Sequence, residues 1–165
     1  MVSTTIQDAV NEQIRHEVYS AYLYLSMSAY CESLSLHGSA KWLRVQWEEE
    51  LSHALRLIDY LFARGGRAVL QAIDRPPTDF KSPLELFQQV LSHEQKVTSL
   101  IDKLYDLALK ENDHAAQVEL QWFIKEQVEE EKNASAIVQQ LEMIGGHTGA
   151  LMMLDRQLGK RGAEK

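Results

Sequence analysis

Glu50 and His53, three residues apart in a segment with a helical pattern, say most about the chemistry of this sequence. Because a helix turns about 100° per residue, side chains three positions apart lie roughly 60° apart on one face. A carboxylate and an imidazole placed in this way can bind one metal ion together. A Glu-x-x-His pair is also half of the pattern that builds two-metal carboxylate sites in helical bundles. The spacing therefore predicts a metal site on this helix.

Polar residues interrupt the apolar stripe of three other helical segments. The first segment contains Glu17 and, seven residues later on nearly the same face, Tyr24. The third contains Glu94, and the fourth contains Gln127 and Glu130, again three residues apart. One buried carboxylate from each of four helices would be costly without a cation to neutralise the group. The combination predicts a metal centre shared by all four helices.

The types of these residues narrow the choice of metal. Oxygen-rich ligation with a single imidazole suits iron, manganese or zinc, whereas structural zinc sites usually use cysteine. Cys31 is the one cysteine of the chain, so neither a disulfide nor a cysteine-pair metal site can form within it. Two metal ions that share bridging carboxylates can pass two electrons to dioxygen, which a single zinc ion cannot do.

A second acidic group adjoins the first. Glu126, Glu129 and Glu130 are spaced three and four residues apart, and Glu49 precedes Glu50. These residues are predicted to form a third, more exposed metal site beside the metal pair. A solvated run of charges is the alternative, and the pattern alone leaves both open.

Each candidate has a simpler explanation when it is taken alone. Most helical glutamates lie on solvated faces, and this is what we expect for Glu131. A single histidine such as His53 is more often a hydrogen-bonded core residue than a ligand. Tyr24 alone would be a core residue whose hydroxyl finds a partner. The combination of residues, and no single one of them, favours a metal centre.

The elements that must position these residues are helices. Five are expected, at about 5–34, 39–64, 83–111, 113–144 and 148–158, within a single domain of residues 1–165. Short connections make antiparallel hairpins of the first two and of the next two. The long, mostly extended link of residues 67–81 lets the second and third helices run parallel. The fold class predicted is all-α, a ferritin-like four-helix bundle with one long crossover between helices 2 and 3 and a short fifth C-terminal helix.

Composition excludes several classes of function. The formal net charge is −7 and no basic stripe is present, so we expect no nucleic-acid partner. No apolar stretch approaches the length that spans a bilayer, so we expect no membrane association. The N-terminal residues carry no export signal, which favours a cytoplasmic location.

The motifs above resemble those of bacterial non-haem ferritins over essentially the whole chain. The resemblance is carried by segments 11–24, 48–53 and 120–132, the last of which includes Leu-Gln-Trp-Phe and Glu-Gln-x-Glu-Glu-Glu-Lys. Bacterioferritins, by contrast, place a haem-ligating methionine just before the helix-two histidine, where this chain has Ser52. We therefore expect no haem.

The resemblance also implies roles for the site residues. Glu17, Glu50 and His53 would bind one iron ion of a ferroxidase centre. Glu94 and Glu130 would complete the second iron site, with Glu50 bridging and Gln127 close by. Tyr24 would hydrogen-bond to the centre and donate an electron during oxygen reduction. In the family a third iron site uses residues of the types found here as Glu49, Glu126, Glu129 and Glu130.

The function implied is iron storage with ferroxidase activity. Fe²⁺ would be oxidised by dioxygen or peroxide and stored as ferric oxyhydroxide inside a homo-oligomeric cage of twenty-four subunits, with the fifth helix at its four-fold axes. The turn 111–114 and Glu119 would lie near three-fold channels, unless they are ordinary surface residues. Two alternatives stay open: a di-iron oxidase or oxygenase with an organic substrate, and a purely structural bundle whose glutamates are solvated.

Overall fold

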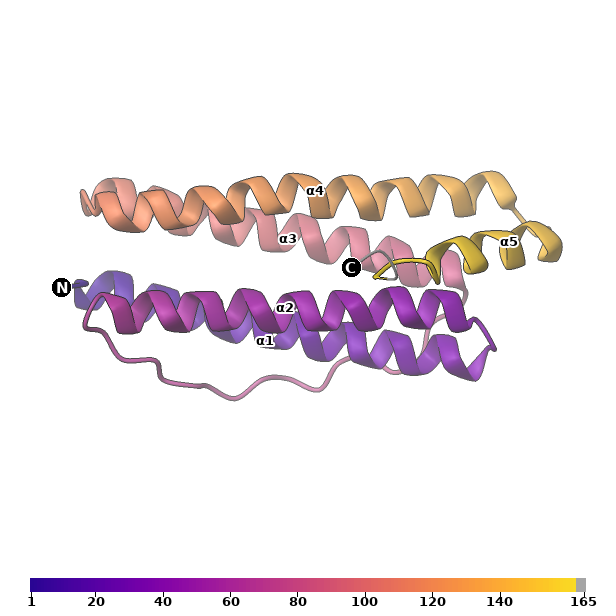
Figure 1. The fold of residues 1–165 in the computed structure, drawn as a ribbon, viewed down its shortest axis with the longest axis horizontal. Helices are drawn as coiled ribbons and strands as arrows, with labels where there is room; N and C mark the ends of the chain where they lie inside the picture. The colour runs from indigo at the N-terminus through magenta and orange to yellow at the C-terminus, as the bar shows by residue number, and fades with distance from the viewer. Residues whose placement is uncertain (163–165) are drawn as a thin grey trace.

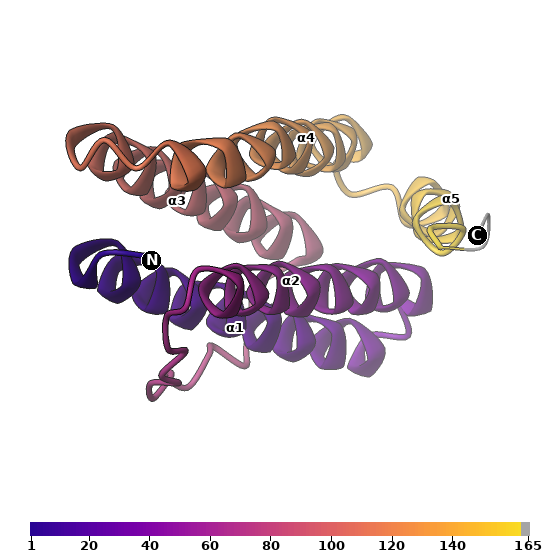
Figure 2. The same ribbon diagram turned by 60° about the vertical axis from the view of Figure 1, so that its left-hand side comes forward.

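The fold is a bundle of four long helices with a fifth, short helix packed at one end. The computed structural model describes residues 1–162. Its helices are α1 (Thr4–Ser33), α2 (His37–Ala63), α3 (Pro83–Lys110), α4 (His114–Ile144) and α5 (Thr148–Leu158). α1 packs against α2 and α3 packs against α4, and α5 folds back toward the start of α2 (Figures 1 and 2). The predicted all-α bundle with a long crossover and a short fifth helix is confirmed.

An extended crossover links α2 to α3 and runs along the whole bundle (Figure 1). Side chains of α1 hold it at both ends. Asn11 donates to the carbonyl of Arg67 at 2.9 Å and accepts from the N–H of Val69 at 2.7 Å. At the far end the Tyr30 hydroxyl donates to the carbonyl of Phe80 at 2.6 Å. Because the link spans the bundle, α3 starts at the same end as α2 and the two helices run parallel.

The start of α3 follows its sequence signal closely. Pro83 occupies the first turn, and the Ser82 hydroxyl accepts from the N–H of Glu85 at 3.1 Å. The Glu85 carboxylate accepts from the N–H of Lys81, one residue before the cap. Side chains therefore bind two main-chain N–H groups at this helix start. The arrangement resembles a capping box, except that the glutamate binds the N–H of Lys81 and not that of the cap residue Ser82.

The turn between α1 and α2 lies earlier than the sequence indicates. The second helix is predicted to begin at about residue 39, but α2 already begins at His37 and the left-handed residue is Ser35, with φ of 59°. The cause is a cap supplied by α5. The Asp155 carboxylate accepts from the N–H groups of Gly38 at 2.9 Å and Ser39 at 2.7 Å. These N–H groups would otherwise lack partners. The cap therefore lets α2 start two residues before the predicted position.

The hydrophobic core is divided into two clusters, and every long helix contributes to both. One cluster lies at the end of the bundle that carries α5 and includes Tyr24, Met27, Leu43, Phe87 and Ile137. The other lies at the opposite end and includes Ile14, Leu57, Ile101, Leu120 and Phe123. On each helix the predicted site residues other than Tyr24 fall between its contributions to the two clusters. The core is thus interrupted at mid-bundle by a polar layer.

Large apolar side chains also remain on the outer surface of a single chain. Exposed examples are Phe62, Leu70, Val118, Val128 and Met153, which come from α2, the crossover, α4 and α5. None of the helices within residues 1–162 has the length and apolar composition needed to cross a membrane.

Gly38→Ala is expected to displace α5. A Cβ atom at this position would lie 1.7 Å from the main-chain oxygen of Asp155, so the helices must separate. Overpacking of this kind costs about 1–3 kcal/mol, and we expect a lower melting temperature together with faster proteolysis after residue 144. Gly149→Ala is the control, because a Cβ there meets nothing within 4 Å. Equal melting temperatures for both variants would contradict the packing described.

Candidate metal centre

The polar layer gathers one ionisable group or more from each long helix. Glu17 comes from α1, Glu50 and His53 from α2, Glu94 from α3 and Glu130 from α4, and each side chain is between 1% and 4% exposed. Each lies on the same face as buried apolar neighbours one turn away, which forces the side chain inward. The structure therefore brings together at mid-bundle the five residues that the sequence placed there.

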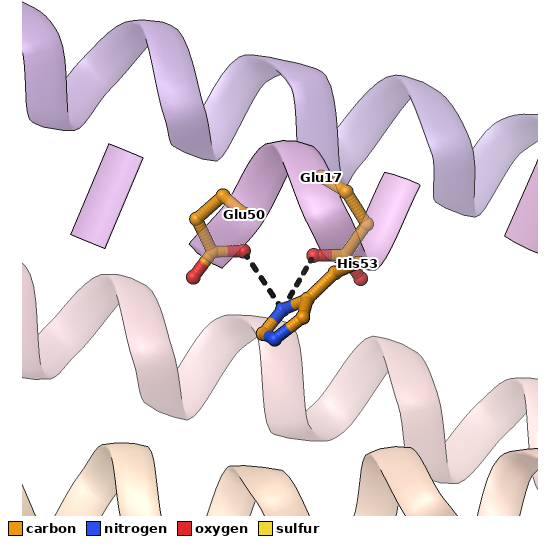
Figure 3. Close-up of side chains that lie close together, drawn as sticks. All are labelled: Glu17, Glu50 and His53. Carbon is orange, nitrogen blue, oxygen red and sulfur yellow. Dashed lines mark ion pairs between the residues drawn. The ribbon is translucent and has the colours of Figure 1, made fainter. Parts of the chain in front are cut away.

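Glu17, Glu50 and His53 form one compact group, shown in Figure 3. Their ligand atoms lie within 4.8 Å of one another. His53 Nδ1 is 3.3 Å from Glu50 Oε2 and 4.0 Å from Glu17 Oε2. Glu17 Oε2 is buried and has no hydrogen-bond partner. Since buried polar atoms are nearly always paired, this oxygen is well suited to a metal ion.

Glu94 is held from two sides by residues that the sequence analysis had singled out. The Tyr24 hydroxyl donates to Glu94 Oε1, and Gln127 Nε2 donates to Glu94 Oε2 at 3.1 Å. The same Gln127 nitrogen lies 3.2 Å from the main-chain oxygen of Glu94. Tyr24 and Gln127 thus hold one oxygen each of this carboxylate and fix its orientation.

Two further glutamines, which were not predicted from the sequence, belong to the centre. Gln13 Nε2 donates to Glu17 Oε1 at 2.7 Å. Gln46 Nε2 donates to Glu130 Oε2 at 2.7 Å and lies 3.3 Å from Glu50 Oε1. Each glutamine stands four residues before a glutamate of the centre on the same helix. This i, i+4 spacing is the signal that could have identified them.

Burial makes the charged state of the carboxylates costly. Desolvation raises the pKa of Glu17 and of Glu50 well above its usual range, and the proximity of Glu94 raises the pKa of Glu50 further. Burial, followed by repulsion from Glu94, raises the pKa of Glu130 to about 7. Within residues 1–162 no lysine or arginine forms an ion pair with any of the four carboxylates. A bound cation would relieve this repulsion and stabilise the ionised forms.

The outer acidic group is only partly assembled. Glu126 is half-buried, and its carboxylate forms a second group with His53 and Glu130, with ligand atoms within 4.8 Å of one another. Glu129 is exposed, and Glu49 is bound by an arginine instead. Glu49 and Glu129 therefore join no such group among the described residues.

Glu131 differs from its sequence interpretation as a solvated residue. It is half-buried, and its Oε1 lies 2.6 Å from the hydroxyl of Thr98. That hydroxyl is also 3.3 Å from the side-chain nitrogen of Gln127. Glu131 thus contacts the surroundings of the centre through Thr98, which a pattern of adjacent glutamates cannot reveal.

The acidic residues predicted near a channel are partly neutralised within the chain. Asp113 caps α4 by accepting from the N–H of Ala116 at 3.0 Å, and it pairs with Arg64 at 3.0 Å. Glu119 pairs with Arg56 at 2.5 Å. Both carboxylates therefore have structural partners, and the channel role stays a prediction.

Comparisons with known proteins agree with this architecture. The profile of the ferritin-like domain family matches residues 7–144. A bacterial non-heme ferritin of Bacteroides fragilis is 44% identical over 161 residues, which cover 98% of this chain and 100% of that protein. A probable bacterial non-heme ferritin-like protein of Haemophilus influenzae is 38% identical over 159 residues, 96% of each chain. An open-pore ferritin of Archaeoglobus fulgidus is 46% identical with a TM-score of 0.96, over 98% of this chain and 99% of that one.

The pH dependence of stability should report the raised pKa of Glu130. A group whose pKa is higher in the folded state stabilises the fold at low pH. This stabilisation is lost as the pH rises from the ordinary 4.5 to the folded value of about 7. The melting temperature of the metal-free protein should therefore decline over this interval. Glu130→Gln should reduce the decline by a few degrees, measured by calorimetry at matched salt. A decline of the same size in both proteins would contradict the buried, repelled state of this carboxylate.

Proposed function

The chain belongs to the ferritin family, and on that premise we propose that it is an iron-storage protein with ferroxidase activity. It oxidises Fe²⁺ to Fe³⁺ with dioxygen or peroxide and stores the product as ferric oxyhydroxide inside a cage of twenty-four subunits. The observation that carries the proposal is the buried, unpartnered Oε2 of Glu17, 4.0 Å from His53 Nδ1 within a layer of four carboxylates.

Iron is the substrate of the proposed reaction. Glu17, Glu50 and His53 would hold one Fe²⁺. Glu94 and Glu130 would hold a second, with Glu50 between the two and Gln127 beside them. Carboxylate oxygens are hard, anionic ligands that favour Fe³⁺ over Fe²⁺, so they promote electron loss. Two Fe²⁺ at one centre supply two electrons to the oxidant in each turnover.

Residues that support the ligands keep the centre in a defined state. Burial and the neighbouring Glu94 raise the pKa of Tyr24 well above its usual range, so the phenol stays protonated. It then acts as a hydrogen-bond donor to Glu94, and in the proposed reaction it would donate an electron to the centre. Gln13 and Gln46 hold one oxygen each of Glu17 and Glu130. These bonds leave other carboxylate oxygens available to the substrate ions.

A third iron site next to the centre would use Glu49, Glu126, Glu129 and Glu130. The exposure of these residues increases outward: Glu130 is buried, Glu126 is half-buried and Glu129 is exposed. Ions that leave the centre by this route would meet progressively better solvated, and therefore weaker, ligands. The route gives Fe³⁺ a path from the centre toward the mineral.

The oligomeric cage is supported by the apolar side chains that a single chain leaves exposed. Leu70 and Met153 are each 73% exposed, Val118 is 69% and Val128 is 68%. Burying such groups between subunits would be favourable. In the proposed assembly α5 lines the four-fold axes. The cytoplasmic location stays a prediction from the sequence.

The two alternative functions receive less support. An oxidase with an organic substrate would need an apolar pocket that opens onto the metals. An apolar hollow of about 430 Å³ lies between α4 and α5, but it is lined by Met143, Met153 and Leu154 and by no proposed ligand. A purely structural bundle would have no use for four buried carboxylates without counter-charges, which destabilise the fold.

Aerobic loading with excess Fe²⁺, followed by size-exclusion chromatography, tests storage. We expect iron to co-elute with a particle of cage size, far above the two or three ions per chain that the ligands can hold. Iron that stops at about two per chain in a small oligomer would overturn the storage proposal. That result would leave a di-iron enzyme.

Glu50→Ala tests the centre itself. Because Glu50 contributes to both proposed iron sites, its loss should slow the initial rate of Fe²⁺ oxidation by at least about tenfold. Glu48→Ala is the matched control, since it removes the same charge from an exposed position two residues away on α2. Initial rates are followed by the absorbance of Fe³⁺ at a fixed protein concentration. Similar rates in the two variants would show that oxidation occurs elsewhere.

A further inference from the structure

After α5, the side chain of Arg161 reaches the surroundings of the metal centre. Its Nη1 donates to Gln46 Oε1 at 2.8 Å, and its Nη2 donates to Glu49 Oε2 at 2.5 Å. The guanidinium also lies 4.3 Å from the ring centroid of Trp42. Arg161 therefore contacts three residues of α2, although more than a hundred positions separate them in the sequence. Its side chain is 20% exposed, so solvent screens it only partly.

The contact with Gln46 determines which way that amide points. A guanidinium can only donate hydrogen bonds, so the group facing Arg161 must be the Gln46 oxygen. The Gln46 nitrogen then faces the centre, where it donates to Glu130 and approaches Glu50. Without Arg161 the amide would lose the contact that favours this orientation. Arg161 is thus linked to two proposed iron ligands through one intervening side chain.

The contact with Glu49 has a second consequence. Glu49 is a candidate ligand of the outer metal site, but in the structure its carboxylate already holds a cation, the Arg161 guanidinium. The same guanidinium is held close to the centre, because it donates to Gln46, whose amide donates to Glu130. A metal ion bound at the outer site would therefore be repelled by Arg161 and would compete with it for Glu49.

We propose that Arg161 is a positioning residue of the metal centre, which orients Gln46 toward Glu50 and Glu130 and competes with metal ions for Glu49. The proposal deepens the proposed function and rests on it for the identity of the ion. It makes the outer site weaker than its four carboxylates alone would suggest. Because Arg161 follows α5, metal binding at the centre would also depend on the packing of α5 against α2.

The docking of α5 explains how Arg161 arrives at this place. Asp155 caps the start of α2. The backbones of Gly159 and Gly38 also lie close together, because a Cβ atom added at Gly159 would be 3.1 Å from the Cα of Gly38. These contacts fix the end of α5 beside α2, so the next turn of chain lies over Trp42. A merely structural role, in which Arg161 only fastens this segment, is the competing explanation.

Metal titration of the metal-free protein separates the two explanations. Zn²⁺ is added anaerobically to the wild type, Arg161→Ala and Lys160→Ala, and calorimetry follows the binding of successive ions. In Arg161→Ala we expect the third ion to bind at least about threefold tighter, because a competing cation is gone. The first two ions should bind up to about tenfold more weakly, because Gln46 is no longer oriented. Lys160→Ala removes the same charge from an exposed neighbouring residue and should match the wild type.

Opposite changes at the inner and outer sites are the signature of the proposal. Uniform weakening of all ions in Arg161→Ala would indicate a structural role alone and would overturn it. An unchanged third ion would overturn it as well. If Arg161→Ala fails to assemble, Arg161→Lys tests the proposal instead. The lysine keeps the positive charge beside Glu49 but cannot bind Gln46 and Glu49 together as the guanidinium does. It should weaken only the first two ions, and wild-type binding throughout would overturn the proposal.

The same titration distinguishes failure of this inference from failure of the proposed function. If the wild type binds no stoichiometric metal at all, the metal centre itself is refuted. If the wild type binds the first two ions and the Arg161 variants match it, only the role of Arg161 is refuted. Gln46→Ala gives an independent check, because it should weaken the first two ions and leave the competition at Glu49 in place.

Discussion

The burial of four carboxylates in one layer, without a lysine or arginine paired to any of them within residues 1–162, is the constraint on which the rest of the structure depends. Such a layer opposes folding, because desolvation and mutual repulsion both penalise its charged form. The core must compensate, and it does so on both sides of the layer. Each long helix runs from one apolar cluster through the layer into the other, which also explains why the helices are so long.

The residues that support the carboxylates are neutral, and this choice follows from the need to bind cations. Gln13, Gln46 and Gln127 each donate a hydrogen bond to one or more of the glutamates. An amide satisfies one oxygen without neutralising the carboxylate, so the negative charge stays available to a metal ion. A lysine or arginine in the same place would form a strong pair and would compete with the ion. Amide support therefore leaves the layer unstable when it is empty and stable when it is filled.

The sequence could predict which charged residues gather in the buried layer, but not everything that holds them. Glu17, Glu94 and Glu130 were found because a charged residue within an apolar helical stripe is conspicuous. Gln46 was missed because glutamine is equally common on solvated faces, and only its spacing before Glu50 marks it. The contacts of Asp155 and Arg161 with α2 join residues more than a hundred positions apart, and no local pattern encodes such pairs. The predicted start of α2, at about residue 39, was two residues late for the same reason, because the cap of this helix comes from α5.

The distribution of positive charge around the layer bears on how iron could pass through it. The inner group holds His53 as its only basic side chain among the described residues, whereas Arg161 lies at the outer edge beside Glu49. A site that must pass its ion onward cannot bind that ion as tightly as the site that oxidises it, or transfer would stop there. A fixed cation at the outer edge lowers affinity at that point without removing a ligand. If Arg161 acts as proposed, tight inner binding and weak outer binding would both depend on one arginine, placed by the docking of a short terminal helix.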